Sequence, residues 1–89
     1  MNWVYQIEGD ALRELKRLDR EAQRRIVRYL DTRVAGTEDP RRFGQSLGGD
    51  LHGLWRWRVA DYRIVGRVKD DIVLVSVVRV GHRKDVYDF

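Results

Sequence analysis

The first half of the chain contains one short apolar stretch followed by two amphipathic ones. Residues 3–7 are rich in aromatic and β-branched side chains and predict a strand. After Asp10, the expected N-cap, apolar residues recur at helical spacing and predict a first helix. A second helix is predicted over about residues 19–34, because apolar residues recur there every four positions. These are Ala22, Ile26, Leu30 and Val34.

The second half changes to the alternation that is typical of strands. Residues 39–53 carry four glycines and the only proline of the chain, which predicts a loop. Residues 54–59 and 62–68 predict a hairpin with Ala60 and Asp61 at its tip. Residues 72–80 are almost wholly apolar, as a central strand should be.

This β-α-α-β-β-β order predicts an α+β fold. We expect two N-terminal helices packed on one face of a largely antiparallel four-stranded sheet. The 89 residues fit a single domain that spans the whole chain, residues 1–89.

The predicted hairpin separates its side chains into an apolar face and a basic face. With a two-residue tip, Arg58 opposes Arg63, and Arg56 lies on the same face. The opposite face is aromatic and aliphatic and is expected to cover the helices, through Trp55, Trp57, Tyr62 and Ile64. Like charges directly opposite one another destabilise a sheet. Either nearby carboxylates pair with these arginines, or the face binds a polyanion; the scarcity of acidic residues in the hairpin favours the polyanion.

Charge and composition restrict the classes of function. The chain has 18 Lys+Arg against 14 Asp+Glu, a net charge of +4, and arginine far outnumbers lysine. A basic balance favours acidic partners such as nucleic acid, and arginine gives bidentate contacts to phosphate. Genomic codon bias is the alternative explanation for the surface arginines. The absence of cysteine excludes disulfides and thiolate metal sites, and no apolar run is long enough to span a membrane. We therefore expect a cytoplasmic protein without membrane contact.

A second candidate motif, GHRKDVY, follows the apolar strand at residues 81–87. The guanidinium of Arg83 is suited to stabilising charge on a phosphate, and the phenol of Tyr87 to stacking on a base or handling a proton. The alternative is an irregular tail whose tyrosine packs at the sheet edge. His52 and His82 are isolated and give no known metal-ligand spacing, so we expect neither metal nor other cofactor.

Together, LHGLWRWRVADYRIV (residues 51–65) and VGHRKDVY (residues 80–87) resemble the RelE/ParE toxin superfamily, and within it the RelE-like ribosome-dependent mRNA interferases. The resemblance covers essentially the whole chain. It implies a toxin of a type II toxin-antitoxin system that cuts mRNA in the ribosomal A site. The nucleophile would be the RNA's own 2′-hydroxyl, so the reaction requires no metal. The implied partners are a cognate antitoxin, bound in a hetero-oligomer, and the ribosome with its rRNA and mRNA.

The resemblance also implies roles for individual residues. Arg63, Arg83 and Tyr87 match the catalytic positions: a strand arginine that holds phosphate, an arginine for the transition state, and a C-terminal tyrosine that orients substrate or transfers a proton. The residues expected to bind RNA or phosphate are Arg56, Arg58, His82 and Lys84.

Some relatives carry lysines at the positions of Arg56 and Arg58, where a lysine can act as a base. Arginine stays protonated in proteins, so proton abstraction would fall to Tyr87, His82 or a ribosomal group. The main alternative function is a ParE-like inhibitor of DNA gyrase, a binding protein on the same fold. A degenerate, non-catalytic partner in a complex is a third interpretation.

Overall fold

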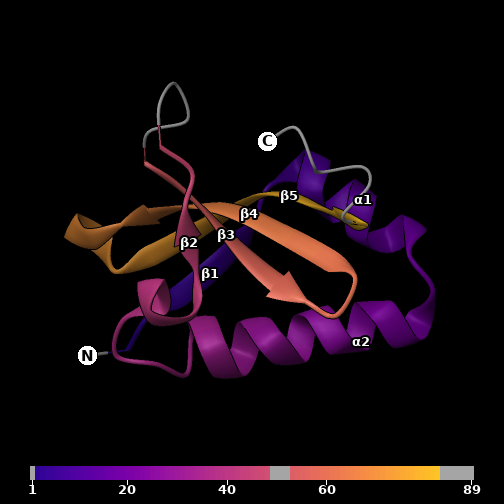
Figure 1. Cartoon of the computed structure of the whole chain (residues 1–89), viewed down its shortest axis with the longest axis horizontal. Coiled ribbons are helices and arrows are strands. Elements are labelled where there is room, and N and C mark those ends of the chain that lie inside the picture. The colour runs from indigo at the N-terminus through magenta and orange to yellow at the C-terminus, as the bar shows by residue number, and fades with distance from the viewer. Residues whose placement is uncertain (1, 49–52, 83–89) are drawn as a thin grey trace.

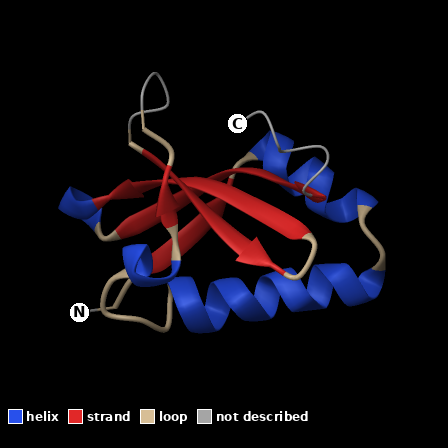
Figure 2. Cartoon of the chain, in the orientation of Figure 1, coloured by secondary structure: helices blue, strands red, loops and turns tan. Residues whose placement is uncertain are grey.

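The structure is a computed structural model that describes residues 2–48 and 53–82. Its strands form one mixed sheet in the order β1-β5-β4-β3-β2, and the helices pack against it (Figures 1 and 2). The strands are β1 (Val4–Ile7), β2 (Gln45–Ser46), β3 (Leu54–Val59), β4 (Tyr62–Lys69) and β5 (Leu74–His82). The helices are α1 (Gly9–Arg17), α2 (Arg20–Tyr29), η1 (Leu30–Val34), η2 (Pro40–Phe43) and η4 (Asp70–Ile72).

The α+β class and the two N-terminal helices are confirmed, whereas the sheet differs from the prediction in two ways. It has a fifth strand, β2, inside the segment that was predicted to be a loop. In addition, β1 pairs with β5 in parallel, while every other pairing is antiparallel. The chain leaves β1 through the helices and returns to the sheet before its last strand runs alongside the first (Figure 1).

The two helices begin differently. The carboxylate of Asp19 accepts a hydrogen bond from the Ala22 amide at 2.8 Å and caps α2. In α1 the N-cap position is held by Glu8, and Asp10, the predicted cap, lies in the first turn. The predicted extent of the second helix is confirmed, with η1 continuing α2 as one wider π-type turn.

The core lies between the sheet and the helices. Trp57 and Ile64, which oppose one another on β3 and β4, are fully buried in it, and Trp55 and Tyr62 pack against the same cluster. From the helical side the core receives Ala11, Leu15, Ile26, Leu30 and Val34. The predicted apolar face of the hairpin is therefore confirmed.

Beyond the end of β1, helix α1 covers the edge of β5. The Glu8 amide still bonds the Val77 carbonyl at 2.9 Å, after which the chain turns into α1. The Glu14 carboxylate then accepts hydrogen bonds from the backbone N–H of Val80 and from Arg79 Nε, both at 3.0 Å. A side chain thus replaces the missing strand partner and fixes the last part of β5. No described helix is long and apolar enough to cross a membrane.

Candidate functional site

Four arginines of the hairpin share the sheet face that points away from the core. The hairpin has the predicted register, in which Arg58 opposes Arg63 and Arg56 opposes Val65. Arg67 opposes Leu54 and so lies on this face as well. We call these four residues, Arg56, Arg58, Arg63 and Arg67, the arginine face.

A small aliphatic cluster separates the arginines. Leu54 and Val65 are buried there, and Leu47 and Val78 pack against them. This cluster is distinct from the main core on the other side of the sheet. The arginine face is therefore a set of cations around an apolar centre, a composition that suits a ligand with both phosphates and flat bases.

Three of these four arginines have no acidic partner in the part of the chain that the structure describes. No ion pair there joins Arg56, Arg58 or Arg67 to a carboxylate, and Arg58 and Arg67 are exposed. Arg56 donates instead to the neutral amide oxygen of Gln45, at 2.6 Å. Its Nε is buried and finds no acceptor within residues 2–48 and 53–82. The polyanion interpretation is thereby favoured over local neutralisation.

Arg41 provides a contrast within the same protein. Its guanidinium pairs with Asp39 at 3.2 Å and with Asp70, and its carbon lies 5.9 Å from the centre of the Trp55 ring. The hydrogen bond that the Arg41 guanidinium donates to the Asp70 carboxylate is the main cause that raises the pKa of Arg41. Arg41 thus links η2 to the turn after β4, and its positive charge is balanced by two carboxylates of the protein itself.

His82 lies on the other face of the sheet from Arg63. It opposes Tyr62, whereas Gly81 opposes Arg63. The rings of His82 and Tyr62 meet edge to face, with centroids 5.7 Å apart. The predicted strand ends at residue 80, whereas Gly81 lies inside β5 in the structure, where it places no side chain beside Arg63.

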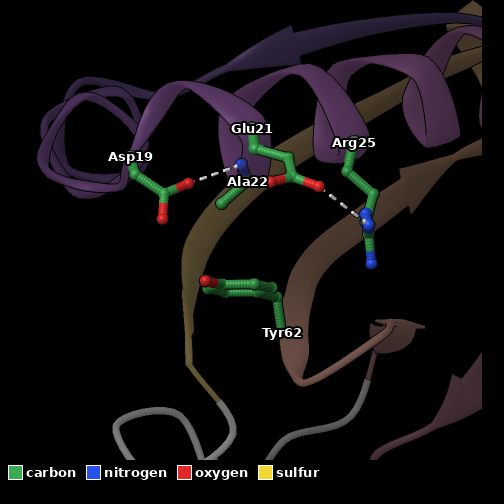
Figure 3. Close-up of a pocket in the computed structure, with 5 residues that line it drawn as sticks. All are labelled: Asp19, Glu21, Ala22, Arg25 and Tyr62. Atoms are coloured by element: carbon green, nitrogen blue, oxygen red, sulfur yellow. Dashed lines mark hydrogen bonds and ion pairs between the residues drawn. The ribbon is translucent and has the colours of Figure 1, made fainter.

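Tyr62 also borders a hollow of about 200 Å³ between the hairpin and the start of α2. Figure 3 shows its ring facing the first turns of that helix, where Glu21 and Arg25 form an ion pair at 3.4 Å. The histidine is therefore placed with the helix-side aromatic residues, away from the arginine face.

Of the sequence-predicted site residues, the structure brings Arg56, Arg58 and Arg63 together. Arg83, Lys84 and Tyr87 lie outside the described residues. The sequence interpretation did not assign Arg67, although it has the same two-residue spacing from Val65 as Arg63. Among residues 2–48 and 53–82, no three His, Cys, Asp or Glu side chains gather so that they could hold a metal ion.

The chain is similar in sequence to known toxins. The family model of the ParE toxin of type II toxin-antitoxin system, parDE, matches residues 5–87. Toxin RelG of Mycobacterium tuberculosis is 28% identical over 87 residues, which cover 98% of both chains. Toxin RelE of the same organism is 30% identical over 81 residues, which cover 91% of this chain and 81% of the relative.

Solved structures agree with the sequence matches. A chain of the toxin-antitoxin complex RelBE2 from Mycobacterium tuberculosis superposes with a TM-score of 0.86 at 25% identity, covering 93% of this chain and all of the other. A variant of E. coli toxin RelE in the free state has the same fold, with a TM-score of 0.74 at 23% identity over 99% of this chain and 93% of its own. Together with the family match, which spans almost the whole chain, these similarities show that the protein belongs to the RelE/ParE family of type II toxin-antitoxin toxins.

Proposed function

We propose that this toxin is a ribosome-dependent endoribonuclease that cuts mRNA in the A site. The observation that carries the proposal is the arginine face, where Arg58 and Arg63 oppose one another and Arg58 has no carboxylate partner among the described residues. Maintaining such a like-charge pair costs stability, which a polyanionic substrate would offset. The two curated relatives carry the names RelG and RelE, in agreement with this proposal.

The reaction would use groups of the RNA itself. The 2′-oxygen attacks the adjacent phosphorus, the bond from phosphorus to the 5′-oxygen breaks, and the products are a 2′,3′-cyclic phosphate and a 5′-hydroxyl. One proton leaves the 2′-hydroxyl and one is delivered to the 5′-oxygen. Arg63 would hold the phosphate, and Arg83 would stabilise the charge that develops in the transition state. Arg56, Arg58 and Lys84 would bind the neighbouring backbone.

Proton abstraction needs a group other than Arg56 or Arg58, because a guanidinium stays protonated. Tyr87 is our candidate for proton transfer on this chain, and a ribosomal group is the alternative. His82 becomes a weaker candidate, because its ring contacts Tyr62 on the opposite side of the sheet from Arg63.

The test uses ribosomes programmed with a defined mRNA and maps the 5′ ends that the purified toxin produces. We expect cuts inside the A-site codon when ribosomes are present and no cuts in a control without ribosomes. Tyr87→Phe and Arg83→Gln should abolish these cuts while far-ultraviolet circular dichroism remains unchanged. Intact mRNA in the presence of ribosomes would contradict the proposal.

The match to the ParE family model supports a second candidate function, inhibition of DNA gyrase without nuclease activity. Expression of the toxin would then lead to accumulation of cleaved DNA–gyrase complexes while mRNA stays intact. The two functions therefore predict opposite results in the same pair of assays.

We also propose that the toxin assembles with a cognate antitoxin in the cytoplasm. The structurally similar RelBE2 chain comes from a toxin-antitoxin complex. An acidic antitoxin segment placed over the arginine face would compete with RNA for the same cations. Co-expression with the neighbouring reading frame, followed by size-exclusion chromatography, tests this assembly.

A further inference from the structure

A hollow of about 260 Å³ lies at the β2–β3 edge of the sheet, beside the arginine face. It is lined by Phe43, Gly44, Gln45, Arg56 and Arg58. Arg56 and Arg58 belong to both surfaces, so a chain of nucleotides bound to the arginine face would pass this hollow. Figure 1 shows β2 as the short outermost strand that forms this edge with β3.

Phe43 gives the hollow an exposed aromatic side chain. Phe43 is 39% exposed, an unusual position for a phenylalanine in a small protein. The guanidinium carbon of Arg33 lies 4.8 Å from the ring centroid and covers one face of the ring. Phe43 lines the hollow, and nucleobases stack on exposed aromatic rings of this kind.

The polar side chains that line the hollow carry several hydrogen-bond donors. The oxygen of the Gln45 amide accepts a hydrogen bond from Arg56 at 2.6 Å, and the nitrogen of this amide is a donor. The guanidinium of Arg56 has further N–H donors beside the one that bonds Gln45, and Arg58 has no acidic partner among the described residues. Such a set of donors fits a base edge that carries oxygen or ring-nitrogen acceptors.

The backbone beneath the hollow is fixed by the core. The indole N–H of Trp57 donates to the Pro40 carbonyl at 2.9 Å in a fully buried contact. A Cβ added to Gly44 would lie 2.8 Å from Trp57 Nε1, so the backbone here rests directly on the indole. The hollow is thus preformed, and base binding would require little ordering of the chain.

We infer that this hollow is a nucleobase-binding subsite, in which an unpaired base stacks on Phe43 and presents acceptors to Gln45 and Arg56. It rests on the proposed function, since the base would belong to the RNA held by the arginine face. The subsite binds and does not catalyse. It favours guanine, whose N7 and O6 acceptors lie side by side, and uracil, which presents O4, over adenine, which places the donor amine N6 beside its N7 acceptor.

The first experiment titrates the full-length toxin with GMP, UMP, AMP and ribose 5-phosphate, and follows backbone amide signals by NMR. All four ligands carry phosphate, but ribose 5-phosphate has no base. We expect the three nucleotides to shift the Gly44 and Gln45 signals more strongly than ribose 5-phosphate, whose phosphate can bind only the arginines, with GMP and UMP binding more tightly than AMP. Phe43→Ala should weaken GMP binding about ten-fold, whereas Phe43→Trp retains it. Leu12→Ala on α1, which removes an apolar side chain of similar exposure, 38%, should leave binding unchanged.

Equal affinity for GMP and ribose 5-phosphate, or unchanged GMP binding by Phe43→Ala, would overturn the inference, as would a failure of every nucleotide to bind. Cleavage of mRNA on programmed ribosomes is measured alongside. If the wild type cleaves and Phe43→Ala has the same KM, the subsite is wrong while the nuclease proposal stands. If the wild type does not cleave but binds GMP through Phe43, the nuclease proposal fails and the base site stands.

Discussion

Arg58 and Arg63 lie directly opposite one another on β3 and β4, two positive charges in one cross-strand pair. The register that brings them together also buries Trp57 against Ile64 on the other face, so it cannot slip without exposing the core. The opposition of these two arginines is therefore built into the fold.

Replacing Arg58 with threonine should stabilise the free toxin and weaken its function. We expect Arg58→Thr to raise the free energy of unfolding by about 0.5 kcal/mol, because the like-charge pair is removed and threonine suits an exposed strand position. The KM for cleavage on the ribosome should rise. Urea denaturation measures the free energy of unfolding. A lower value for Arg58→Thr than for the wild type would contradict a destabilising repulsion between Arg58 and Arg63.

Gly44→Ala tests whether the backbone beside the Phe43 hollow rests on the core. The added Cβ would lie 2.8 Å from Trp57 Nε1, which is held by Pro40, so the change should cost about 1–3 kcal/mol of unfolding free energy. The matched control is Gly48→Ala, where a Cβ meets nothing within 4 Å. If the two variants have the same midpoint of thermal denaturation, the Trp57 indole can move to make room for the added Cβ.

Glu14 supports the last part of β5 through its bonds to Arg79 and to the Val80 amide. Glu14→Ala leaves a buried N–H without its acceptor and should cost about 2 kcal/mol, whereas Glu14→Gln, which keeps one acceptor oxygen, should cost less. Glu21, whose side chain is 83% exposed, pairs with Arg25 at the surface. Glu21→Ala should change stability by less than about 0.5 kcal/mol. If chemical denaturation shows the same loss of unfolding free energy for Glu14→Ala and Glu21→Ala, the contact of Glu14 with β5 does not stabilise the protein.

Tyr5 predicts a pH dependence of stability in the alkaline range. Burial, together with the 2.6 Å hydrogen bond to Asp31 and the negative charge of that carboxylate, raises the pKa of Tyr5 from 10.0 to about 12. Neutral Tyr5 is the donor in this bond, so its contribution to stability is present below pH 10 and is lost as the pH rises to about 12.

The corresponding measurement compares the wild type with Tyr5→Phe over this range. The wild type should be more stable by about 1 kcal/mol at neutral pH, and the difference should disappear between pH 10 and about 12. The pKa of Tyr29 is also raised, chiefly by burial, but Tyr29 is present in both proteins and cancels in the difference. A difference that stays constant up to pH 12 would show that the bond does not form in solution.

The hairpin could be predicted from sequence because its information is local. A two-residue tip fixes the register, and Ala60 adopts the positive φ of 54° that such a turn requires. The same two-residue alternation places Arg67 on the arginine face. The parallel pairing of β1 with β5 joins segments about seventy residues apart. The order of apolar and polar residues within each strand does not indicate which strand it pairs with, or in which direction. The strand β2 is two residues long, too short to show a period.

The face of His82 depends on one irregularity that the sequence does not reveal. The pairing of β4 with β5 shifts at Val65 and Gly66, so that Arg79 opposes Val65 while Val77 opposes Gly66. Val78 is the extra residue of this bulge, and it reverses the alternation for the rest of the strand. Without the bulge, regular alternation from Val77 would place His82 on the arginine face.

The most direct test of the arginine face compares single arginine replacements that change the net charge equally. The quantity measured is kcat/KM for A-site cleavage by Arg63→Gln, Arg58→Gln and Arg24→Gln; Arg24 is exposed on α2, across the sheet from the face. We expect Arg63→Gln to lose at least about 100-fold and Arg58→Gln to lose less. Arg24→Gln should remain within about two-fold of the wild type, because an exposed charge far from the substrate is screened. Equal losses for all three variants, or no loss for Arg63→Gln, would contradict the assignment of this face as the RNA-cleaving surface.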